Sequence, residues 1–199
     1  MSETIESVLE FWLGELGADG RASPEMVGRW WRKSDAFDQE IRDRFLSVHA
    51  AIANDQLEGW HETPRGRLAY VIVLDQFSRN MFRDTPQMYA EDKRCQRVAL
   101  EGYDDKGLSE LRYHERYFLF MPMMHAEDIE LQRRGVELFA SLERDFPGNA
   151  EGARQAMSFM RQHHDIVERF GRFPHRNKIL GRETTAEEAE FLSTPGSSF

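Results

Sequence analysis

The stretch TPRGRLAYVIVLDQF, residues 63–77, decides the fold. It opens with Thr63 and Pro64, a pair typical of a helix N-cap followed by proline at the first helical position. From Leu68 to Leu74 the residues are continuously apolar and leave little polar face. A helix that is apolar on all sides is surrounded by other elements. We therefore expect a helix from residue 64 through Leu74 at the centre of the molecule.

The segments on either side of this stretch have the period of amphipathic helices. In one of them, apolar residues step by four, four, three and four, which places them on one helical face; they are Phe37, Ile41, Phe45, Val48 and Ile52. Further helix starts are indicated at Ser23-Pro24, Ser34 or Asp35, Thr85-Pro86 and Thr185 with Glu188, and helix ends at Gly102 and Gly171. A long helix is expected from about Ala150 to Phe170, and a break or kink near Pro122.

No run alternates between apolar and polar residues for long enough to predict a half-buried strand. The sequence therefore predicts an all-α fold of stacked antiparallel helix pairs. With 199 residues, of which 40% are hydrophobic and 31% charged, the chain fits one helical domain over residues 1–199. The tail from about residue 194, STPGSSF from Ser193, is expected to be frayed.

Charge and cysteine content narrow the classes of function. The net charge of −9 disfavours nucleic acid and anionic membranes as partners, because both require positive surface. Cys95 is the only cysteine, so neither an internal disulfide nor a thiolate metal cluster can form. The apolar run at the centre is far shorter than a membrane span, and the N-terminus is acidic where a signal peptide is basic. We expect a cytoplasmic location.

The segment GRFPHRN, residues 171–177, is the strongest site candidate. It concentrates polar groups on either side of Phe173 and Pro174, namely Arg172, His175, Arg176 and Asn177. Residues 161–182 carry six positive and two negative side chains, a local charge of +4 in an acidic chain. Such a basic island indicates either an anion-binding pocket or a structural clamp onto acidic helices, and the sequence favours neither over the other.

Two other segments supply candidate groups. Asp75, Gln76, Arg79 and Arg83 follow the central apolar run, where a structural network is favoured for Asp75 and Gln76, while a ligand role is as well supported as a structural one for Arg79. His125 follows the proline of MPMMHAED, residues 121–128, and is a candidate general base.

His163 is the second candidate general base, although a histidine on an apolar helical stripe is more often a core residue. A metal site would need ligands such as His125, Glu127 and His163, and no pair of histidines at helical spacing accompanies a carboxylate. We expect no metal and no cofactor, since phosphate-loop, dinucleotide and zinc-protease motifs are all absent.

The chain resembles the bacterial proteins grouped as domain of unknown function 924. The motifs that carry the resemblance are VLEFWLGELG from Val8, the tandem Trp30-Trp31, DQFSRNMFR from Asp75, MPMMHAED from Met121 and RFGRFPHRNKILGRETTAEEAEFL from Arg169. Ser78 and Ala126 depart from the family pattern, which has proline and serine there. The resemblance implies an all-α fold similar to tetratricopeptide-repeat domains, and it implies no established activity.

We therefore predict an uncharacterised helical protein that binds a small anionic metabolite in a polar pocket. The pocket residues are expected to be Arg79, Arg83, His125, His163, Arg172, His175, Arg176 and Asn177. One alternative is a scaffold that binds a protein or peptide in a helical groove. Another is a hydrolase-like enzyme with His125 or His163 as general base, although no nucleophile can be named. The sequence leaves the oligomeric state open.

Overall fold

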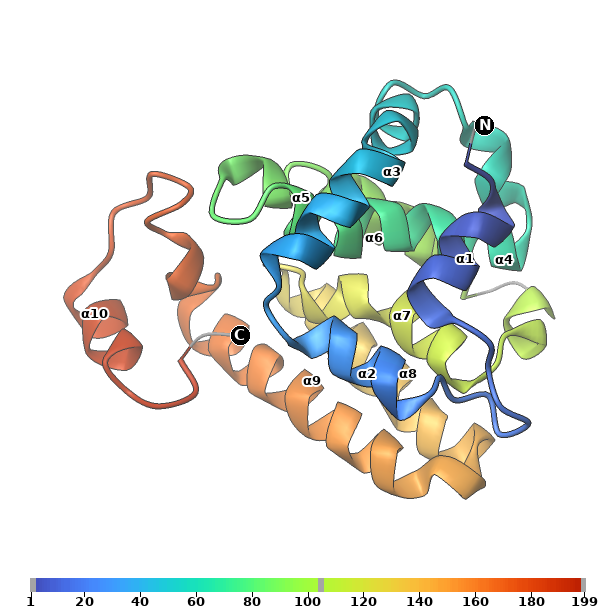
Figure 1. The fold of residues 1–199 in the computed structure, drawn as a ribbon. Helices are drawn as coiled ribbons and strands as arrows, with labels where there is room; N and C mark the ends of the chain where they lie inside the picture. Colours follow the sequence, from blue (N-terminus) through green and yellow to red (C-terminus); the bar gives the residue numbers. More distant parts are fainter. Residues whose placement is uncertain (1–2, 104–105, 198–199) are drawn as a thin grey trace.

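The computed structural model describes residues 3–103 and 106–197, and within them it contains helices and no strand (Figure 1). The predicted all-α fold is confirmed. The α-helices are α1 (Ile5–Leu13), α2 (Pro24–Trp31), α3 (Asp35–Ala53), α4 (Pro64–Val71), α5 (Ser78–Met81), α6 (Asp92–Glu101), α7 (Tyr113–Met124), α8 (Ile129–Asp145), α9 (Ala150–Phe170) and α10 (Ala186–Leu192). Shorter turns are η1 (Glu58–Glu62), η2 (Ile72–Phe77), η3 (Pro86–Tyr89), η4 (Lys106–Glu110), η5 (Pro147–Asn149) and η6 (Pro174–Arg176). Similarity to tetratricopeptide-repeat domains stays a prediction.

The central stretch forms one continuous helical rod from α4 through η2 to α5. Every residue from Gly66 to Ser78 is buried, as the apolar run predicted. The rod is longer than expected: it continues beyond Leu74 to Met81, and its middle part, η2, is π-helical. A π-helical turn widens the helix and often marks a functional position. Here it contains two of the polar residues of the buried stretch, Asp75 and Gln76.

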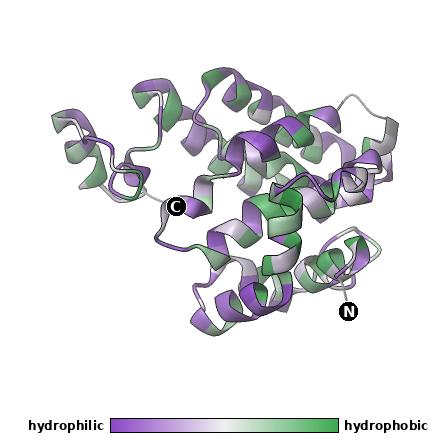
Figure 2. Cartoon of the chain, turned by 90° about the horizontal axis from the view of Figure 1, so that it is seen from above, coloured by the Kyte–Doolittle hydropathy of each residue, from purple (hydrophilic) through white to green (hydrophobic). Residues whose placement is uncertain are grey.

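The other helices pack around this rod. Helices α1, α6 and α7 contact α4, while α3 contacts both η2 and α5. Aromatic rings fill the space between them: the ring of Trp12 lies 5.6 Å from those of Phe77 and Phe118, and Phe45 lies 4.7 Å from Phe77. Helix α8 packs against both α7 and α9. Most helices carry apolar and polar faces together, as Figure 2 shows by colour.

Most of the predicted helix boundaries are confirmed. Ser23, Ser34, Thr63 and Thr185 each accept a hydrogen bond from the first turn of the helix that follows. The start predicted at Thr85 is wrong, because Pro86 opens only the short turn η3 and α6 begins at Asp92. Pro122 lies inside α7, which ends two residues later at Met124.

Beyond α9 the chain leaves the bundle. Gly171 ends the helix in the left-handed conformation, with φ of 69°, as expected for a glycine cap. Residues 171–197, here called the C-terminal arm, then extend to the side of the bundle (Figure 1, red). The arm shares a small apolar cluster with the end of α9, formed by Ile166, Val167, Phe170, Phe173 and Phe191, separate from the main core. Polar contacts must therefore supply much of its attachment.

Among the described residues, no helix has the length and apolar character needed to cross a membrane. The arm itself remains ordered by hydrogen bonds near its end, where Thr194 and Ser197 donate to the carbonyl oxygens of Phe191 and Leu192. The expected fraying of the tail therefore stays a prediction, and its last residues, 198–199, lie outside the described part.

The close approach of η1 to α4 yields a prediction about stability. A Cβ atom on Gly66 would overlap the carbonyl oxygen of Trp60, whereas a Cβ atom on the exposed helical Gly28 would meet nothing within 4 Å. Gly66→Ala should lower the free energy of unfolding by about 1–3 kcal/mol. Gly28→Ala, the matched control, should raise it by about 0.5–1 kcal/mol. Urea denaturation measures both, and equal effects would contradict this packing.

Candidate functional site

The arm meets the bundle along a group of buried and half-buried polar side chains, here called the polar seam. The bundle contributes Asp75, Arg79, Tyr89, Asp92, His125, Glu127 and His163, and the arm contributes Phe173, His175, Arg176 and Arg182. These residues come from η2, α5, η3, α6, α9 and η6, and from the connections that follow α7, α9 and η6. The fold thus joins positions that are far apart in the chain.

Asp75 is the most deeply placed charge of the seam, with 1% of its surface exposed. Its Oδ1 atom lies 2.8 Å from His125 Nδ1 and 2.9 Å from Arg79 Nη1, and Gln76 donates to Oδ2. Burial alone would raise the pKa of the Asp75 carboxyl. The Arg79 guanidinium and His125 outweigh that effect and hold the pKa well below its usual range. Asp75 is therefore an anion that the π-helical turn presents to His125.

Asp92 joins the bundle to the arm through two arginines. Arg79 Nη2 donates to both carboxylate oxygens at 3.0 and 3.2 Å, and Arg176 Nη1 donates to Oδ2 at 3.1 Å. The other terminal nitrogen of Arg176 donates to the carbonyl oxygen of His125 at 3.0 Å. The guanidinium groups of Arg79 and Arg176 thus share one carboxylate, that of Asp92, across the seam.

Arg176 is held in a rigid sandwich. Its guanidinium carbon lies 4.4 Å from the centre of the Tyr89 ring and 4.6 Å from that of Phe173. The residue is 5% exposed, yet its Nε atom has no hydrogen-bond partner among the described residues, and neither has Arg182 Nε. Buried donors in folded proteins are normally paired, so these two N–H groups point to an acceptor that is still to be identified.

Glu127 provides the second anchor of the arm. It accepts hydrogen bonds from the backbone N–H of Phe173 at 2.8 Å and from Arg182 at 2.7 and 2.9 Å. Burial raises the pKa of Glu127, but these donors lower it below its usual value. The carboxylate is therefore ionised at neutral pH, and it holds the segment before His175 in place.

Three histidines complete the seam. The ring centres of His125 and His163 lie 6.3 Å apart, and the Phe173 ring lies 5.6 Å from both His163 and His175. Burial, together with the positive charge of Arg176, lowers the pKa of His163 to about 3 and that of His175 to about 4. Burial and Arg79 also lower the pKa of His125. All three imidazoles are neutral at pH 7.

The charges of the seam balance. Three arginines, Arg79, Arg176 and Arg182, stand against three carboxylates, Asp75, Asp92 and Glu127, and the histidines add none. Two basic residues of the island, Arg176 and Arg182, are therefore neutralised by distant carboxylates, while Arg169 and Arg172 pair with Glu187 and Glu188 of the arm itself. This is the arrangement expected of a clamp, and it means that an anion would not meet a positive field here.

The remaining predicted site residues have other contacts. Arg83 binds Asp38 of α3 with two hydrogen bonds, at 2.7 and 2.9 Å. Arg172 binds Glu188 in the same two-pronged way, and Asn177 donates to Glu188 and Thr184. The bonds of Arg172 and Asn177 lie within the arm and order it internally. The structure thus brings Arg79, His125, His163, His175 and Arg176 together, and engages Arg83, Arg172 and Asn177 in separate networks.

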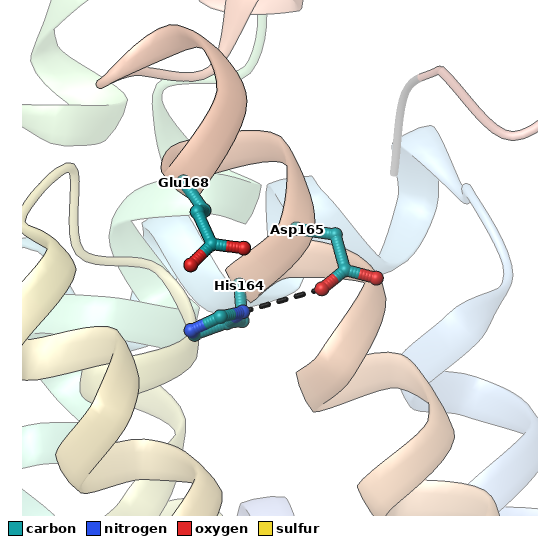
Figure 3. Close-up of side chains that lie close together, drawn as sticks. All are labelled: His164, Asp165 and Glu168. Carbon is teal, nitrogen blue, oxygen red and sulfur yellow. Dashed lines mark hydrogen bonds and ion pairs between the residues drawn. The ribbon is translucent and has the colours of Figure 1, made fainter.

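A group of side chains with metal-binding chemistry lies on α9, where the sequence did not indicate one. His164, Asp165 and Glu168 each offer a ligand atom within 4.8 Å of the others (Figure 3). His164 Nδ1 already pairs with Asp165 at 3.2 Å, and both carboxylates are exposed. The ligands considered from sequence are used differently: Glu127 binds Arg182, and His163 Nδ1 lies 2.8 Å from the carbonyl oxygen of Phe159.

Sequence reasoning missed Asp92, Tyr89 and the pairing of Arg182 with Glu127. Asp92 sits in the first turn of α6, where an acidic residue is ordinary because it faces the positive end of the helix dipole. Its partners Arg79 and Arg176 lie 13 and 84 positions away, so no local spacing indicates the contact. An unmatched cluster of arginines in an acidic chain was the one available signal.

Comparison with known proteins identifies a family whose description assigns no function. The model of a family described as bacterial protein of unknown function, DUF924, matches residues 8–196. The solved structure of ATU0120, a protein of unknown function from Agrobacterium tumefaciens, is similar with a TM-score of 0.80 and 38% identity, over 95% of this chain and 96% of that one. No functionally curated protein matches the chain.

The neutral histidines predict how stability depends on pH. Because the pKa of His163 is about 3 in the folded chain and 6.5 ordinarily, the unfolded chain binds more protons between these values, and stability falls as pH falls below 6.5. Between pH 6.5 and 4.5, before most carboxylates titrate, His163→Gln should reduce this slope by up to about 1.4 kcal/mol per pH unit.

Urea denaturation across that pH range measures the slope. His164→Gln is the matched control, since it changes the neighbouring position on the same helix without touching the seam. His49 and His114, whose pKa values burial also lowers to about 4, contribute equally to every variant. The same slope in wild type and His163→Gln would show that His163 is not a buried neutral group.

Proposed function

The chain belongs to the DUF924 family of bacterial proteins, and because that family's description assigns no activity, we propose a function from the polar seam: it binds a small molecule through a carboxylate or phosphate group. The observation that carries this proposal is Arg176, which is buried and sandwiched between two rings but keeps one N–H without a partner among the residues that the structure describes. A planar guanidinium held in this way is suited to an oxyanion.

A purely structural role explains Arg176 less completely. The contacts with Asp92 and with the carbonyl oxygen of His125 use both terminal nitrogens and already attach the arm. Leaving Nε–H buried and unpaired costs about 1–3 kcal/mol, which a clamp gains nothing from. Arg182 carries the same unpaired atom while both of its terminal nitrogens bind Glu127. A bound oxyanion can accept a hydrogen bond from such an Nε–H group, and in the absence of the ligand a water molecule can do so.

The balanced charge of the seam restricts how an anion can bind. With three arginines and three carboxylates already paired, the ligand adds an uncompensated negative charge. The nearby neutral imidazoles of His125, His163 and His175 can take up a proton and restore the balance. We therefore infer that binding at neutral pH is accompanied by proton uptake, which calorimetry in buffers of different ionisation enthalpy detects.

A second candidate function is acid–base catalysis by His125, and the contact between His125 and Asp75 favours it. A carboxylate only accepts hydrogen bonds, so the 2.8 Å contact places the proton on Nδ1 and leaves the lone pair on Nε2. An ionised, buried carboxylate that orients a neutral histidine is the arrangement of a general base and its orienting group. No nucleophile is assigned, so the attacking group would be water.

The scaffold alternative remains the outcome to exclude. It expects the arginines and histidines of the seam to serve only as internal ion pairs, and most of their contacts are of this kind. Arg176→Ala does not separate the two cases, because removing one partner of a buried pair costs about 3–5 kcal/mol whatever the function. A variant is needed that keeps a positive charge next to the carboxylate of Asp92.

Arg176→Lys is that variant, since lysine keeps the charge and lacks the guanidinium N–H edge. A thermal-shift panel of small carboxylates and phosphates should contain a compound that raises the melting temperature of the wild type by about 2 °C or more. Arg176→Lys should weaken that compound about tenfold or more, because a charge-assisted hydrogen bond is lost. Arg83→Lys, at the separate pair with Asp38, is the control and should bind normally.

Two results would contradict ligand binding at the seam. In one, no compound of the panel stabilises the wild type. In the other, the same compound stabilises Arg176→Lys and the wild type equally. Either result would leave the ion pairs as a clamp and favour the scaffold.

The catalytic candidate makes a separate prediction. If His125 is a general base, the chain should hydrolyse p-nitrophenyl acetate or p-nitrophenyl phosphate, and His125→Gln should lower the rate by at least about 100-fold. Burial lowers the pKa of His125 below 6.5, so the imidazole stays neutral above that pH. The rate should therefore stay constant from pH 8 down to at least pH 6.5. His164→Gln is the control variant, and an unchanged rate in His125→Gln would exclude this role.

A further inference from the structure

A cavity of about 650 Å³ lies apart from the seam residues, where the start of α1 meets η1, the start of α4 and the end of η4. Its lining has an apolar part and a charged part. The apolar residues are Ile5, Leu57, Trp60 and Pro64, and the charged residues are Glu3, Glu6, Arg65 and Glu110. This volume lies within the range of small-molecule sites, and the lining combines apolar and charged side chains.

Close packing of the backbone builds the walls of this cavity. Gly66 allows the carbonyl oxygen of Trp60 to approach α4, and a Cβ atom on Gly107 would overlap the ring of Pro64. The segments around η1 and η4 are thus pressed against the beginning of α4. The half-buried Trp60 therefore presents its indole at a fixed wall of the open space.

One carboxylate of the lining, Glu110, is not engaged by an arginine among the described residues. Arg65 is already bound to Glu6, at 2.8 Å, and to the buried Glu115, so its charge is not available to an anion. The helix ends near Thr4 and Thr63 add roughly half a positive charge each, and both caps accept a backbone N–H. Since Arg44 pairs with Glu3 at 3.2 Å and Arg65 with Glu6, Glu110 is the lining carboxylate that has no ion pair among the described residues.

We propose that this cavity binds a small organic ammonium compound with an apolar or aromatic body. The body packs on Trp60, Leu57 and Ile5, and the cationic group lies toward the carboxylates, where the indole face also attracts it. The net charge of −9 over the whole chain further raises the local concentration of cations over anions. The proposal rests on this cavity alone and is independent of ligand binding at the seam.

The test compares three probes of the same shape and different charge: benzylammonium, benzyl alcohol and benzoate. Titration followed by the indole N–H signals in ¹H–¹⁵N spectra should show benzylammonium shifting one signal, which is absent in Trp60→Phe. Benzyl alcohol should bind about two- to fivefold more weakly, because it lacks the ion-pair contribution, and benzoate more weakly still. Raising the salt concentration should weaken benzylammonium selectively.

Two charge variants complete the test. Glu110→Gln leaves the pairs of Arg65 with Glu6 and of Arg44 with Glu3 intact and should weaken benzylammonium about two- to fivefold. Glu10→Gln is the matched control, an exposed residue of α1 outside the lining, and should leave binding unchanged.

Three results would overturn the proposal. The first is no shift of any indole signal by benzylammonium. The second is equal affinity for the three probes. The third is equal weakening by Glu110→Gln and Glu10→Gln. Because both are substitutions of exposed residues, unaltered circular dichroism is expected for each and distinguishes lost binding from lost folding.

Discussion

Burial of the helical rod from Pro64 to Met81 is the constraint on which the rest of the structure depends. Its residues from Gly66 to Ser78 are inaccessible to solvent, so helices must cover it on every side. The same burial carries the polar end of the rod into the interior, where Asp75 must find partners. It finds them in Arg79 and His125. Burial of the apolar rod thus also buries the polar group of Asp75, Arg79 and His125 beside the core.

That polar group then determines how the C-terminal arm attaches. The arm has only a small apolar cluster, and its contacts with the bundle pass through Asp92 and Glu127. Buried ion pairs are expensive to form, because desolvation offsets most of the Coulomb attraction. An apolar joint would hold the arm at least as well. The arginines, carboxylates and neutral histidines at this joint are therefore in keeping with the binding or proton transfer that we propose for the seam.

The π-helical turn links the buried rod to the candidate site. A regular α-helix through residues 72–77 would rotate the positions that follow, and with them Arg79, relative to the partners on α6 and after α7. The turn places Asp75 against His125 while Arg79 reaches Asp92. The fold and the candidate site thus depend on the same irregularity in the most deeply buried helix.

The sequence by itself determined the helical class, the buried rod and most helix boundaries. These follow from local features: apolar periodicity, cap residues such as Ser34 and Thr185, and the glycine at position 171 that adopts the left-handed conformation. It also placed five of the seam residues in the expected pocket, because arginine and histidine are concentrated next to Phe173 and Pro174 and at the ends of apolar helical segments. It did not reveal the extension of the rod beyond Leu74 or its π-helical turn, since no local pattern encodes them.

Only the tertiary structure decided what those residues contact. Asp92 meets Arg176 across 84 positions, and Glu127 meets Arg182 across 55. These two carboxylates neutralise two of the four excess positive charges in the window 161–182, and Glu187 and Glu188 of the arm pair with Arg169 and Arg172. Ion pairing between distant helices depends on how the helices pack, and the spacing of residues along the chain carries no information about that packing. The same holds for the unpaired Nε–H of Arg176, because only the folded chain shows which donors are left without an acceptor.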